Sequence, residues 1–382
     1  MTSKRLNDLL RHCNIDPIAQ GEVSVGAITS DSRKVREGSL FIALRGVSSD
    51  GHRYLESVAG KGAVAALVEK VDPAVAMTQI VVPDTRELWG KALSWLHDEP
   101  ERALRFVGIT GTNGKTTTSY ILEKMLNDAG ISTGIIGTIE YRYHNTRIPA
   151  PFTSPDPEIL YPLLASMRES GVEVVIMEVS SHGLAQERVK GLTFDAALLT
   201  NFTQDHLDFH KTMEEYALAK RLLFTNYLRE GALVAAWAES DALHTIIPGN
   251  LTPVLYTMGD GGAAWHARNV AVTLDGLSAE LHGPEGVQML TSVLIGEHNV
   301  LNITGAMILA GAFGVTADQA LAAVRDVTVP GRLQRVAGPV PVFVDYAHTP
   351  DALDHAQESL KPLVAGRLIT VFGCGGDRDA QK

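Results

Sequence analysis

Residues 111–118, Gly-Thr-Asn-Gly-Lys-Thr-Thr-Thr, constrain the fold more than any other stretch, because they join an apolar run to a helical pattern. Residues 106–110 are the predicted strand before this loop, and residues 116–129 are the predicted helix after it. Glycines let backbone N–H groups approach an anion, and the start of a helix adds unpaired donors. Lys115 can reach the β- and γ-phosphates of a nucleotide, and the Thr116 hydroxyl can bind Mg²⁺. The loop therefore predicts a nucleotide site in an α/β fold with a mainly parallel sheet.

Short apolar runs alternate with helical patterns along most of the chain, which is typical of stacked βα units. Residues 270–295 differ, because apolar and polar residues alternate there between glycine turns, which predicts an antiparallel ribbon. Polar or Pro-Gly breaks at residues 98–101 and 330–331 suggest domain boundaries. The predicted domains are residues 1–100, 101–329 and 330–382.

The last predicted domain is short. It holds predicted strands at residues 342–344 and 368–372 on either side of a helix near residues 351–360. The chain stops ten residues after the second strand. Because one βαβ unit cannot cover both faces of a parallel sheet, we expect this third domain to be incomplete in the chain.

Composition excludes several classes of protein. The formal net charge of -11 disfavours nucleic acid as a partner, because phosphate backbones need a basic surface. No apolar run approaches the roughly 20 residues of a membrane span, and the first residues lack the apolar core of a signal peptide. Cys13 and Cys374 are the two cysteines, too few for a disulfide framework. A reduced, cytoplasmic location without membrane insertion is expected.

Polar residues also follow other predicted strands. Glu178 ends an apolar strand, where an acid beside a phosphate loop can hold Mg²⁺, although a surface acid would show the same pattern. Asp205, His206 and His210 follow the next strand, and their spacing does not decide which of them binds metal. Taken alone, Lys220 would be a surface lysine. The glycine-rich residues 373–379 could form a turn or a second anion loop.

Taken together, several segments resemble the Mur ligase family and occur in the family's order. These segments are residues 29–33, 38–41, 111–118, 153–157, 177–184, 205–210, 219–220, 296–299, 331–332, 345–353 and 373–379. Three of them, Glu-Val-Ser-Ser-His-Gly-Leu, Asp-Tyr-Ala-His-Thr-Pro-Asp and Gly-Cys-Gly-Gly-Asp-Arg-Asp, are specific to the branch that adds the third residue of the peptidoglycan stem peptide.

The resemblance implies three domains: one for the UDP moiety, a central ATP-binding domain, and a Rossmann-like domain that selects the amino acid. It implies an ATP- and Mg²⁺-dependent ligase of peptidoglycan biosynthesis, and so of cell-wall biogenesis, cell shape and cell division. The enzyme would add meso-diaminopimelate or lysine to the D-glutamyl γ-carboxylate of UDP-N-acetylmuramoyl-L-alanyl-D-glutamate. The reaction would pass through an acyl phosphate. A monomer is expected.

The resemblance also assigns roles to residues. For the nucleotide, it implies Gly111, Thr112, Asn113, Gly114, Lys115, Thr116, Thr117, Asn299, Arg332, Asp345 and His348. For Mg²⁺, it implies Thr116, Glu178, His206 and Lys220, and for catalysis it implies Lys115, Lys220 and His206. Lys220 matches a carbamylated lysine of the family. For the UDP-linked substrate, it implies Ser32, Thr153, Ser154, Ser180 and Arg188.

The chain departs from the family pattern in two places. Ser154 replaces a threonine and keeps the hydroxyl. The Asp-Asn-Pro-Arg-type motif that reads the amino acid would lie beyond Lys382, so the choice between meso-diaminopimelate and lysine stays open.

Three alternatives remain. The first is a folylpolyglutamate synthetase-like or other Mur ligase. The second is a kinase or GTPase, although Ile109 stands where their longer phosphate loop has a glycine. The third is a nucleotide-binding fragment without turnover.

Overall fold

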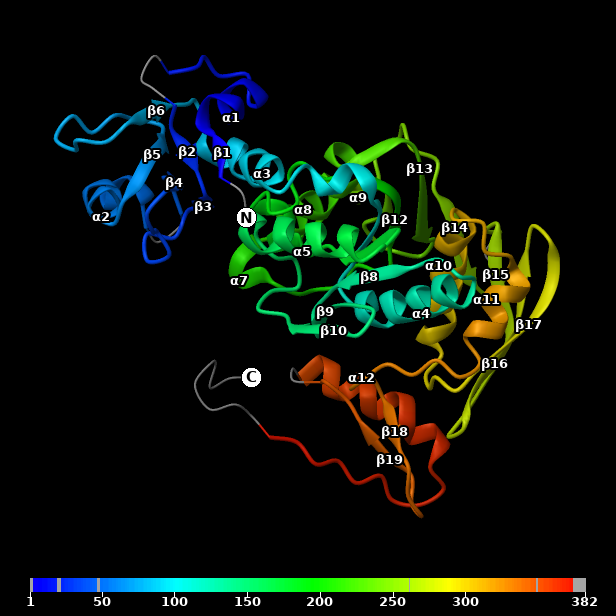
Figure 1. The fold of residues 1–382 in the computed structure, drawn as a ribbon. Coiled ribbons are helices and arrows are strands. Elements are labelled where there is room, and N and C mark those ends of the chain that lie inside the picture. The colour runs from blue at the N-terminus through cyan, green and yellow to red at the C-terminus, as the bar shows by residue number, and fades with distance from the viewer. Residues whose placement is uncertain (1–2, 19–21, 47–48, 261, 348–349, 374–382) are drawn as a thin grey trace. The chain divides into compact units, whose positions relative to one another are not determined.

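The computed structural model describes residues 3–18, 22–46, 49–260, 262–347 and 350–373 of the chain (Figure 1). The chain forms two compact units, and each is made of three separate stretches. Unit 1 contains Met1–Arg105, Ser154–Glu173 and Gly183–Thr193, and unit 2 contains Phe106–Thr153, Val174–His182 and Phe194–Lys382. The division into residues 1–100, 101–329 and 330–382 therefore stays a prediction.

Unit 1 is built on a four-stranded parallel sheet in the order β3-β4-β5-β6. The strands are β3 (Ala27–Thr29), β4 (Ser39–Ile42), β5 (Ala63–Val68) and β6 (Gln79–Val81), beside a small antiparallel pair, β1 (Lys4–Arg5) and β2 (Ser24–Val25). All four residues of β4 are buried, as expected for a parallel strand covered on both faces. The apolar runs at residues 40–44, 63–68 and 80–82 contain strands β4, β5 and β6 or lie beside them, as expected for buried strands.

The helices of unit 1 include one that comes from a distant part of the chain. They are α1 (Leu6–His12), η1 (Gly51–Tyr54), α2 (Leu55–Gly60), α3 (Thr85–Leu96), η2 (Pro100–Ala103) and α5 (Pro157–Glu169). Glu158 of α5 accepts hydrogen bonds from the Thr29 hydroxyl at 2.8 Å and from the backbone N–H of Ser30 at 2.6 Å. The Tyr161 hydroxyl donates to the carbonyl of Lys190 at 3.3 Å. Contacts of this kind join the three stretches into one unit.

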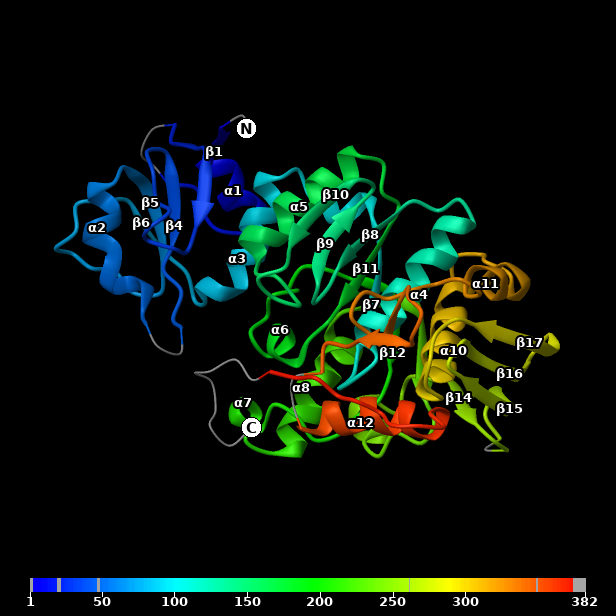
Figure 2. The same cartoon turned by 90° about the horizontal axis from the view of Figure 1, so that it is seen from below.

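Unit 2 contains an 11-stranded sheet in the order β10-β9-β8-β11-β7-β12-β13-β14-β15-β16-β17. Its strands are β7 (Arg105–Thr110), β8 (Thr133–Ile136), β9 (Glu140–Tyr143), β10 (Thr146–Pro149), β11 (Val174–Glu178), β12 (Phe194–Leu199), β13 (Leu228–Trp237), β14 (Val254–Met258), β15 (Trp265–Thr273), β16 (Gly276–Gly283) and β17 (Gly286–Ser292). The central strands pair in parallel, and both ends of the sheet are antiparallel. Figure 2 shows the predicted antiparallel ribbon as β15–β17 at one end.

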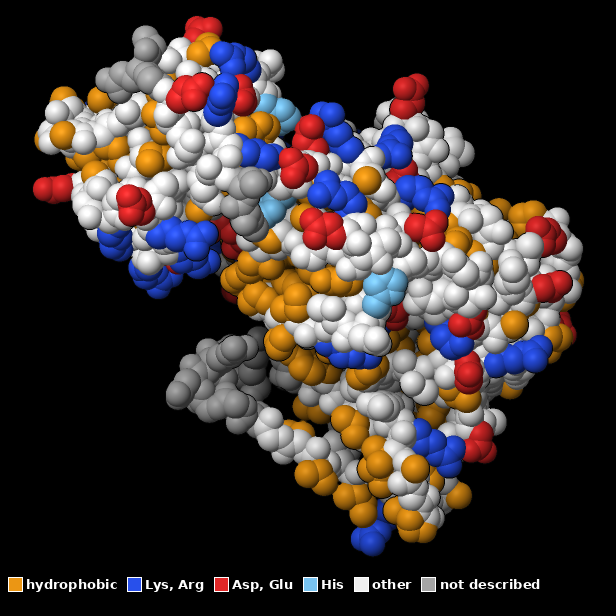
Figure 3. Space-filling view, in the orientation of Figure 1, with side chains coloured by type: hydrophobic (Ala, Val, Ile, Leu, Met, Phe, Trp, Pro, Cys, Tyr) orange, Lys and Arg blue, Asp and Glu red, His pale blue; other side chains and the backbone are white. Residues whose placement is uncertain are grey.

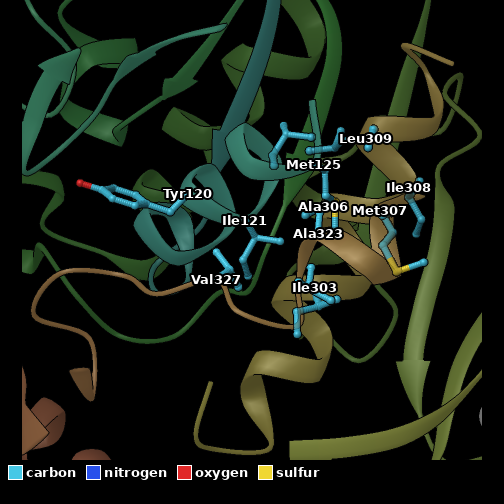
Figure 4. Packing of buried hydrophobic residues seen from close by; sticks show 14 of the residues in the cluster. Tyr120, Ile121, Met125, Ile303, Ala306, Met307, Ile308, Leu309, Ala323 and Val327 are labelled. Atoms are coloured by element: carbon cyan, nitrogen blue, oxygen red, sulfur yellow. The ribbon is translucent and has the colours of Figure 1, made fainter. Parts of the chain in front are cut away.

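The helices of unit 2 pack against this sheet. They are α4 (Lys115–Asp128), α7 (Leu207–His210), α8 (Met213–Asn226), α9 (Leu243–Ile246), α10 (His298–Gly311) and α11 (Ala317–Ala323), with α6 (Ser181–Ala185) where the chain passes into unit 1. Figure 4 shows Ile121 and Met125 of α4 facing residues of α10 such as Ile303 and Ala306, all in one buried cluster. A fully buried Ile or Met contributes about 1.5–3 kcal/mol, so this packing holds the phosphate-loop helix firmly.

Residues 330–373 form a smaller set of elements. Strands β18 (Gln334–Val336) and β19 (Val342–Val344) pair antiparallel, and α12 (Pro350–Leu360) and η3 (Lys361–Leu363) follow. The prediction of a strand at residues 368–372 is wrong, because this segment forms no β-sheet pairing with any described residue. Ile369, Val371 and Phe372 are 73%, 93% and 66% exposed, and Figure 3 shows hydrophobic side chains on the surface of this part of the chain. β-branched residues favour a strand only when a neighbour is there to pair with.

Within the described part of the chain, no helix is both long and apolar enough to cross a bilayer.

Candidate active site

The predicted phosphate loop lies between β7 and α4, as the sequence indicated. Gly111 and Gly114 have φ angles of +143° and +86°, a region that glycine adopts without strain. A Cβ on Gly111 would lie 1.9 Å from the Thr200 hydroxyl oxygen, so no larger residue fits there. Asn113 is exposed, and its backbone N–H donates to the Asn201 side chain at 2.8 Å. The loop is thus held against the end of β12 by its backbone.

Two lysines meet at the start of this loop. Lys115 donates to the carbonyls of Gly111 and Thr112, both at 2.8 Å, and Lys220 donates to the same Gly111 carbonyl at 3.0 Å. Lys220 is 1% exposed, so it is not the surface lysine that its position on a helix suggests. Loss of hydration lowers the pKa of Lys115, although Glu178 acts to raise it. Burial, and then the charge of Lys115, lower the pKa of Lys220 well below its usual value.

Glu178 lies beside the loop at the end of β11, with 1% of its surface exposed. The Thr116 hydroxyl donates to Glu178 Oε2 at 3.0 Å. Carboxylate and hydroxyl oxygens are the ligands that Mg²⁺ prefers, so this pair fits a hard cation next to phosphates. The structure therefore brings together the predicted residues Lys115, Thr116, Glu178 and Lys220.

His206 belongs to a group of aromatic rings beside the loop. Its ring centroid lies 4.8 Å from that of His182 and 5.8 Å from that of Tyr216, and its backbone is left-handed with a φ of +55°. Burial lowers the pKa of His206, which favours the neutral imidazole that a metal requires. Among the described residues, no set of three His, Cys, Asp or Glu side chains is arranged to hold a metal. The role of His206 as a ligand remains a prediction.

Asn299, predicted to contact the nucleotide, is bonded to a residue that sequence reasoning missed. The Asn302 side-chain amide donates to the side-chain oxygen Oδ1 of Asn299 at 2.9 Å and accepts from the Thr118 hydroxyl at 3.4 Å. A Cβ on Gly114 would lie 2.5 Å from Asn302 Oδ1, so Asn302 also fits closely against the loop. The sequence signal for Asn302 is its place three positions after Asn299 on the same side of a mostly apolar helix.

Thr138 is the second residue that sequence reasoning missed. Its hydroxyl donates to Glu178 Oε2 at 2.8 Å and its backbone N–H donates to Oε1 at 3.2 Å. The Gly-Thr pair directly follows β8, and no motif considered in the sequence included it. Because parallel strands β8 and β11 are neighbours, their carboxyl ends bring Thr138 and Glu178 together.

Two predicted nucleotide-binding residues beyond residue 330, Arg332 and Asp345, flank the same end of the antiparallel pair β18–β19. The carboxylate of Asp345 accepts the backbone N–H groups of Leu333 and Ala347, both at 2.8 Å. The Arg332 guanidinium lies over the Tyr346 ring, 5.5 Å from its centroid. Arg332 and Asp345 are thus brought together, while His348 lies outside the described residues.

The predicted substrate residues are divided between the two units. In unit 1, Arg188 donates to the carbonyl of Ser154 at 3.0 Å, and the carbonyl of Ser32 accepts from Lys61 at 2.7 Å. In unit 2, the Thr153 hydroxyl lies 3.1 Å from that of Thr138, and Ser180 follows Glu178 and Val179. Their predicted role toward a substrate stays a prediction.

Comparison with family models identifies the class of this protein. The model of the Mur ligase middle domain matches residues 109–310, the Mur ligase glutamate ligase domain matches residues 331–382, and the Mur ligase catalytic domain matches residues 24–94. The chain therefore belongs to the Mur ligase family.

Two relatives of the chain carry the same enzyme name. The chain is 40% identical over 390 residues to the UDP-N-acetylmuramoyl-L-alanyl-D-glutamate–2,6-diaminopimelate ligase of Geobacter sulfurreducens, covering 99% of this chain and 76% of the relative. It is 36% identical to the enzyme of the same name from Bacillus velezensis, covering 99% and 79%. The expectation of an incomplete third domain stays a prediction.

Solved structures show the same three-domain α/β architecture. A structure of a UDP-N-acetylmuramoyl-L-alanyl-D-glutamate–2,6-diaminopimelate ligase aligns with a TM-score of 0.81 and 29% identity, covering 99% of this chain and 78% of that one. The MurF ligase from Thermotoga maritima in complex with ADP aligns with a TM-score of 0.61 at 21% identity, covering 88% and 74%. The second likeness shows the fold alone.

Proposed function

We propose that this chain is an ATP-dependent ligase that joins 2,6-diaminopimelate to the D-glutamyl γ-carboxylate of UDP-N-acetylmuramoyl-L-alanyl-D-glutamate. The observation that carries this proposal is the phosphate loop, with Lys115 and Thr116 at the start of α4 and Glu178 bonded to Thr116. The names of relatives 36–40% identical to this chain support this reaction, and favour diaminopimelate over lysine. Such an enzyme would act in the cytoplasm as a monomer.

The chemistry follows from the poor reactivity of a carboxylate, whose leaving group would be oxide. Transfer of the γ-phosphoryl group of ATP to the carboxylate gives an acyl phosphate, which the amine of the amino acid attacks with release of phosphate. The backbone N–H groups at the start of α4 bind the phosphates, and Lys115 neutralises the charge that develops on them. Because Gly111 and Thr112 already hold its ammonium, Lys115 needs little reorganisation.

Thr116, Glu178 and His206 would hold Mg²⁺, which neutralises phosphate charge when bound. Lys220 would contribute as a carbamate. Burial lowers the pKa of Lys220, and an unprotonated amine is the form that adds to carbon dioxide. Addition of carbon dioxide to the neutral amine releases one proton and leaves a carbamate anion, which would place a negative charge next to the Lys115 ammonium. Asn299, Arg332, Asp345 and His348 would bind the nucleotide, and Ser32, Thr153, Ser154, Ser180 and Arg188 would bind the UDP-linked substrate.

The test is a reaction with the purified chain, ATP, Mg²⁺, the UDP-linked dipeptide and either diaminopimelate or lysine. We expect a new amide by mass spectrometry with diaminopimelate, and phosphate release only when both acceptors are present. Phosphate release without the dipeptide would instead favour a GTPase-like hydrolase, and transfer of the phosphoryl group to another acceptor would favour a kinase. Binding of ADP in a calorimeter with no amide from any diamino acid would overturn the proposed ligase and favour a nucleotide-binding protein without turnover.

A further inference from the structure

The turn after β8 holds the carboxylate of Glu178 at both oxygens. Thr138 donates its backbone N–H to Oε1 at 3.2 Å and its hydroxyl to Oε2 at 2.8 Å. The residue before it is Gly137, and a Cβ there would lie 2.3 Å from Glu178 Oε1, so a larger residue would push this carboxylate out of its position. Gly137 and Thr138 therefore fit closely around the buried carboxylate of Glu178. These two residues are separate from the phosphate loop, which contacts the same carboxylate through Thr116.

The directions of the hydrogen bonds that link Glu178, Thr138 and Thr153 follow from the donors and acceptors in each group. A hydroxyl has one proton to donate, and a carboxylate only accepts. Thr138 therefore uses its proton on Glu178, and the Thr153 hydroxyl, 3.1 Å from Thr138 Oγ1, must donate to Thr138. With its proton used in this way, the Thr153 oxygen can only accept a hydrogen bond from anything that binds next to it.

We propose that Thr138 is a positioning residue with two effects. It fixes the carboxylate of Glu178 for Mg²⁺, and it makes Thr153 an acceptor for an N–H or O–H group of the UDP-linked substrate. This inference rests on the proposed function, because it assigns Mg²⁺ to Glu178 and the substrate to Thr153. Thr138 then connects the acid of the nucleotide site, Glu178, to the substrate residue, Thr153, through two hydrogen bonds. Orienting partners of this kind are commonly as critical to a metal site as its ligands.

The experiment compares three variants of the whole chain. Thr138→Val removes the hydroxyl while keeping the shape and the backbone N–H, and Thr138→Ser restores a hydroxyl. Thr133→Val is the matched control, because Thr133 is buried on β8 and its hydroxyl donates to Asn127 at 2.9 Å rather than to Glu178. The first measurement is the Mg²⁺ concentration required for ADP binding in a calorimeter, which needs no turnover. The second is the KM for each acceptor.

We expect Thr138→Val to need roughly 10- to 100-fold more Mg²⁺ for ADP binding, since this is the usual effect of losing an orienting partner. Its KM for the UDP-linked dipeptide should rise, while its KM for the diamino acid should not. Thr138→Ser should stay within about threefold of the wild type, and so should Thr133→Val. If Thr138→Val does not give a cooperative thermal melt, Thr138→Ala removes the same hydroxyl and is judged by the same criteria.

An unchanged Mg²⁺ requirement in folded Thr138→Val would overturn the inference, as would an equal loss in Thr138→Ser or Thr133→Val. These results are distinct from failure of the proposed function. A wild-type chain that binds Mg²⁺ and ADP but forms no amide would disprove the ligase, while the comparison of Mg²⁺ requirements would still decide the role of Thr138.

Discussion

Unit 2 buries cations in two different ways. At the phosphate loop, Lys115 and Lys220 donate to backbone carbonyls, and within the described residues neither forms an ion pair. On β9, Arg142 is 5% exposed and donates to the carboxylates of Glu123 and Glu140, at 2.9 Å from its Nε to Glu123 and 3.0 Å from its Nη1 to Glu140. The two lysines therefore lack the carboxylate partners that Arg142 has.

The pKa values follow this difference. Loss of hydration lowers the pKa of both lysines. Burial is the largest single effect on Arg142 and opposes its charge, but the hydrogen bonds and charges of Glu123, Tyr120 and Glu140 together raise its pKa above the usual value. The guanidinium also lies 3.7 Å from the centroid of the Tyr120 ring. A buried cation paired with carboxylates supports the fold, and one held only by neutral groups is available for an anionic ligand.

The strongest test of this contrast is Arg142→Met. It should leave the half-buried Glu123 without its cation and Glu140 with Arg147 alone. The free energy of unfolding should fall by about 3 kcal/mol, the lower end of the usual cost of breaking a buried ion pair, because both carboxylates are only half-buried. Urea unfolding followed by circular dichroism measures this change. Activity per folded molecule should remain close to that of the wild type. A loss of activity without a loss of stability would contradict the assignment of Arg142 to the fold rather than to the active site.

Lys115→Met should have the opposite effect. It removes the charge facing the phosphates, and loss of one such contact commonly lowers the rate by about 10²–10³-fold. Stability should not fall, because the variant no longer buries a poorly hydrated ammonium. Phosphate release and thermal melting of the same preparation measure both effects. A near-normal rate would remove the phosphate loop from the mechanism.

Lys220→Ala sharpens the comparison further, because it tests whether this buried amine works as an anion. We expect activity to fall by at least roughly 10-fold, the usual effect of losing a residue that orients a metal site. Short-chain carboxylic acids added to the reaction should restore part of the rate by supplying the missing negative charge. The same acids should not restore Lys115→Met, which serves as the control. Unchanged turnover of the wild type without bicarbonate would count against the carbamate.

The smallest expected effect is that of Cys13 in unit 1, a buried group that carries no charge at neutral pH. It changes how the stability of the protein depends on pH. Burial raises the pKa of the Cys13 thiol from 9.0 to about 11. Between these values the unfolded chain loses its proton and the folded chain keeps it, so stability falls as pH rises through this window. Thermal melts at several pH values should show this fall, and Cys13→Ala should show a smaller one. Equal slopes in the two proteins would mean that the thiol does not contribute.

Much of the fold could be predicted from local patterns. The strand at residues 106–110, the helix of α4 and the ribbon of β15–β17 depend on apolar periodicity and glycine positions, which the sequence shows directly. The segment at residues 368–372 has the same β-branched composition but no partner strand, and pairing is not encoded in a single segment. Helix α5 was also not predicted, although its residues help to build unit 1.

Site residues could be predicted where a short sequence motif itself fixes the local backbone geometry. Lys115 and Thr116 are positioned by the loop that contains them, and Glu178 by its place at the end of an apolar strand. Lys220 required the family resemblance, because its burial comes from tertiary packing rather than from its helix. Thr138 and Asn302 were missed because their roles depend on the order of strands and on helix packing, which short sequence motifs do not contain.

Unit 1 consists of three separate stretches of the chain, which affects how it folds during synthesis. Glu158 closes hydrogen bonds to Thr29 and Ser30, and Gly90 packs so closely on the carbonyl of Lys190 that a Cβ would lie 2.6 Å from it. On a ribosome, the N-terminal stretch must therefore wait until residues up to Thr193 have emerged before it can complete its core. A fragment expressed as residues 1–105 would lack those partners, whereas a split after residue 193 would retain them all.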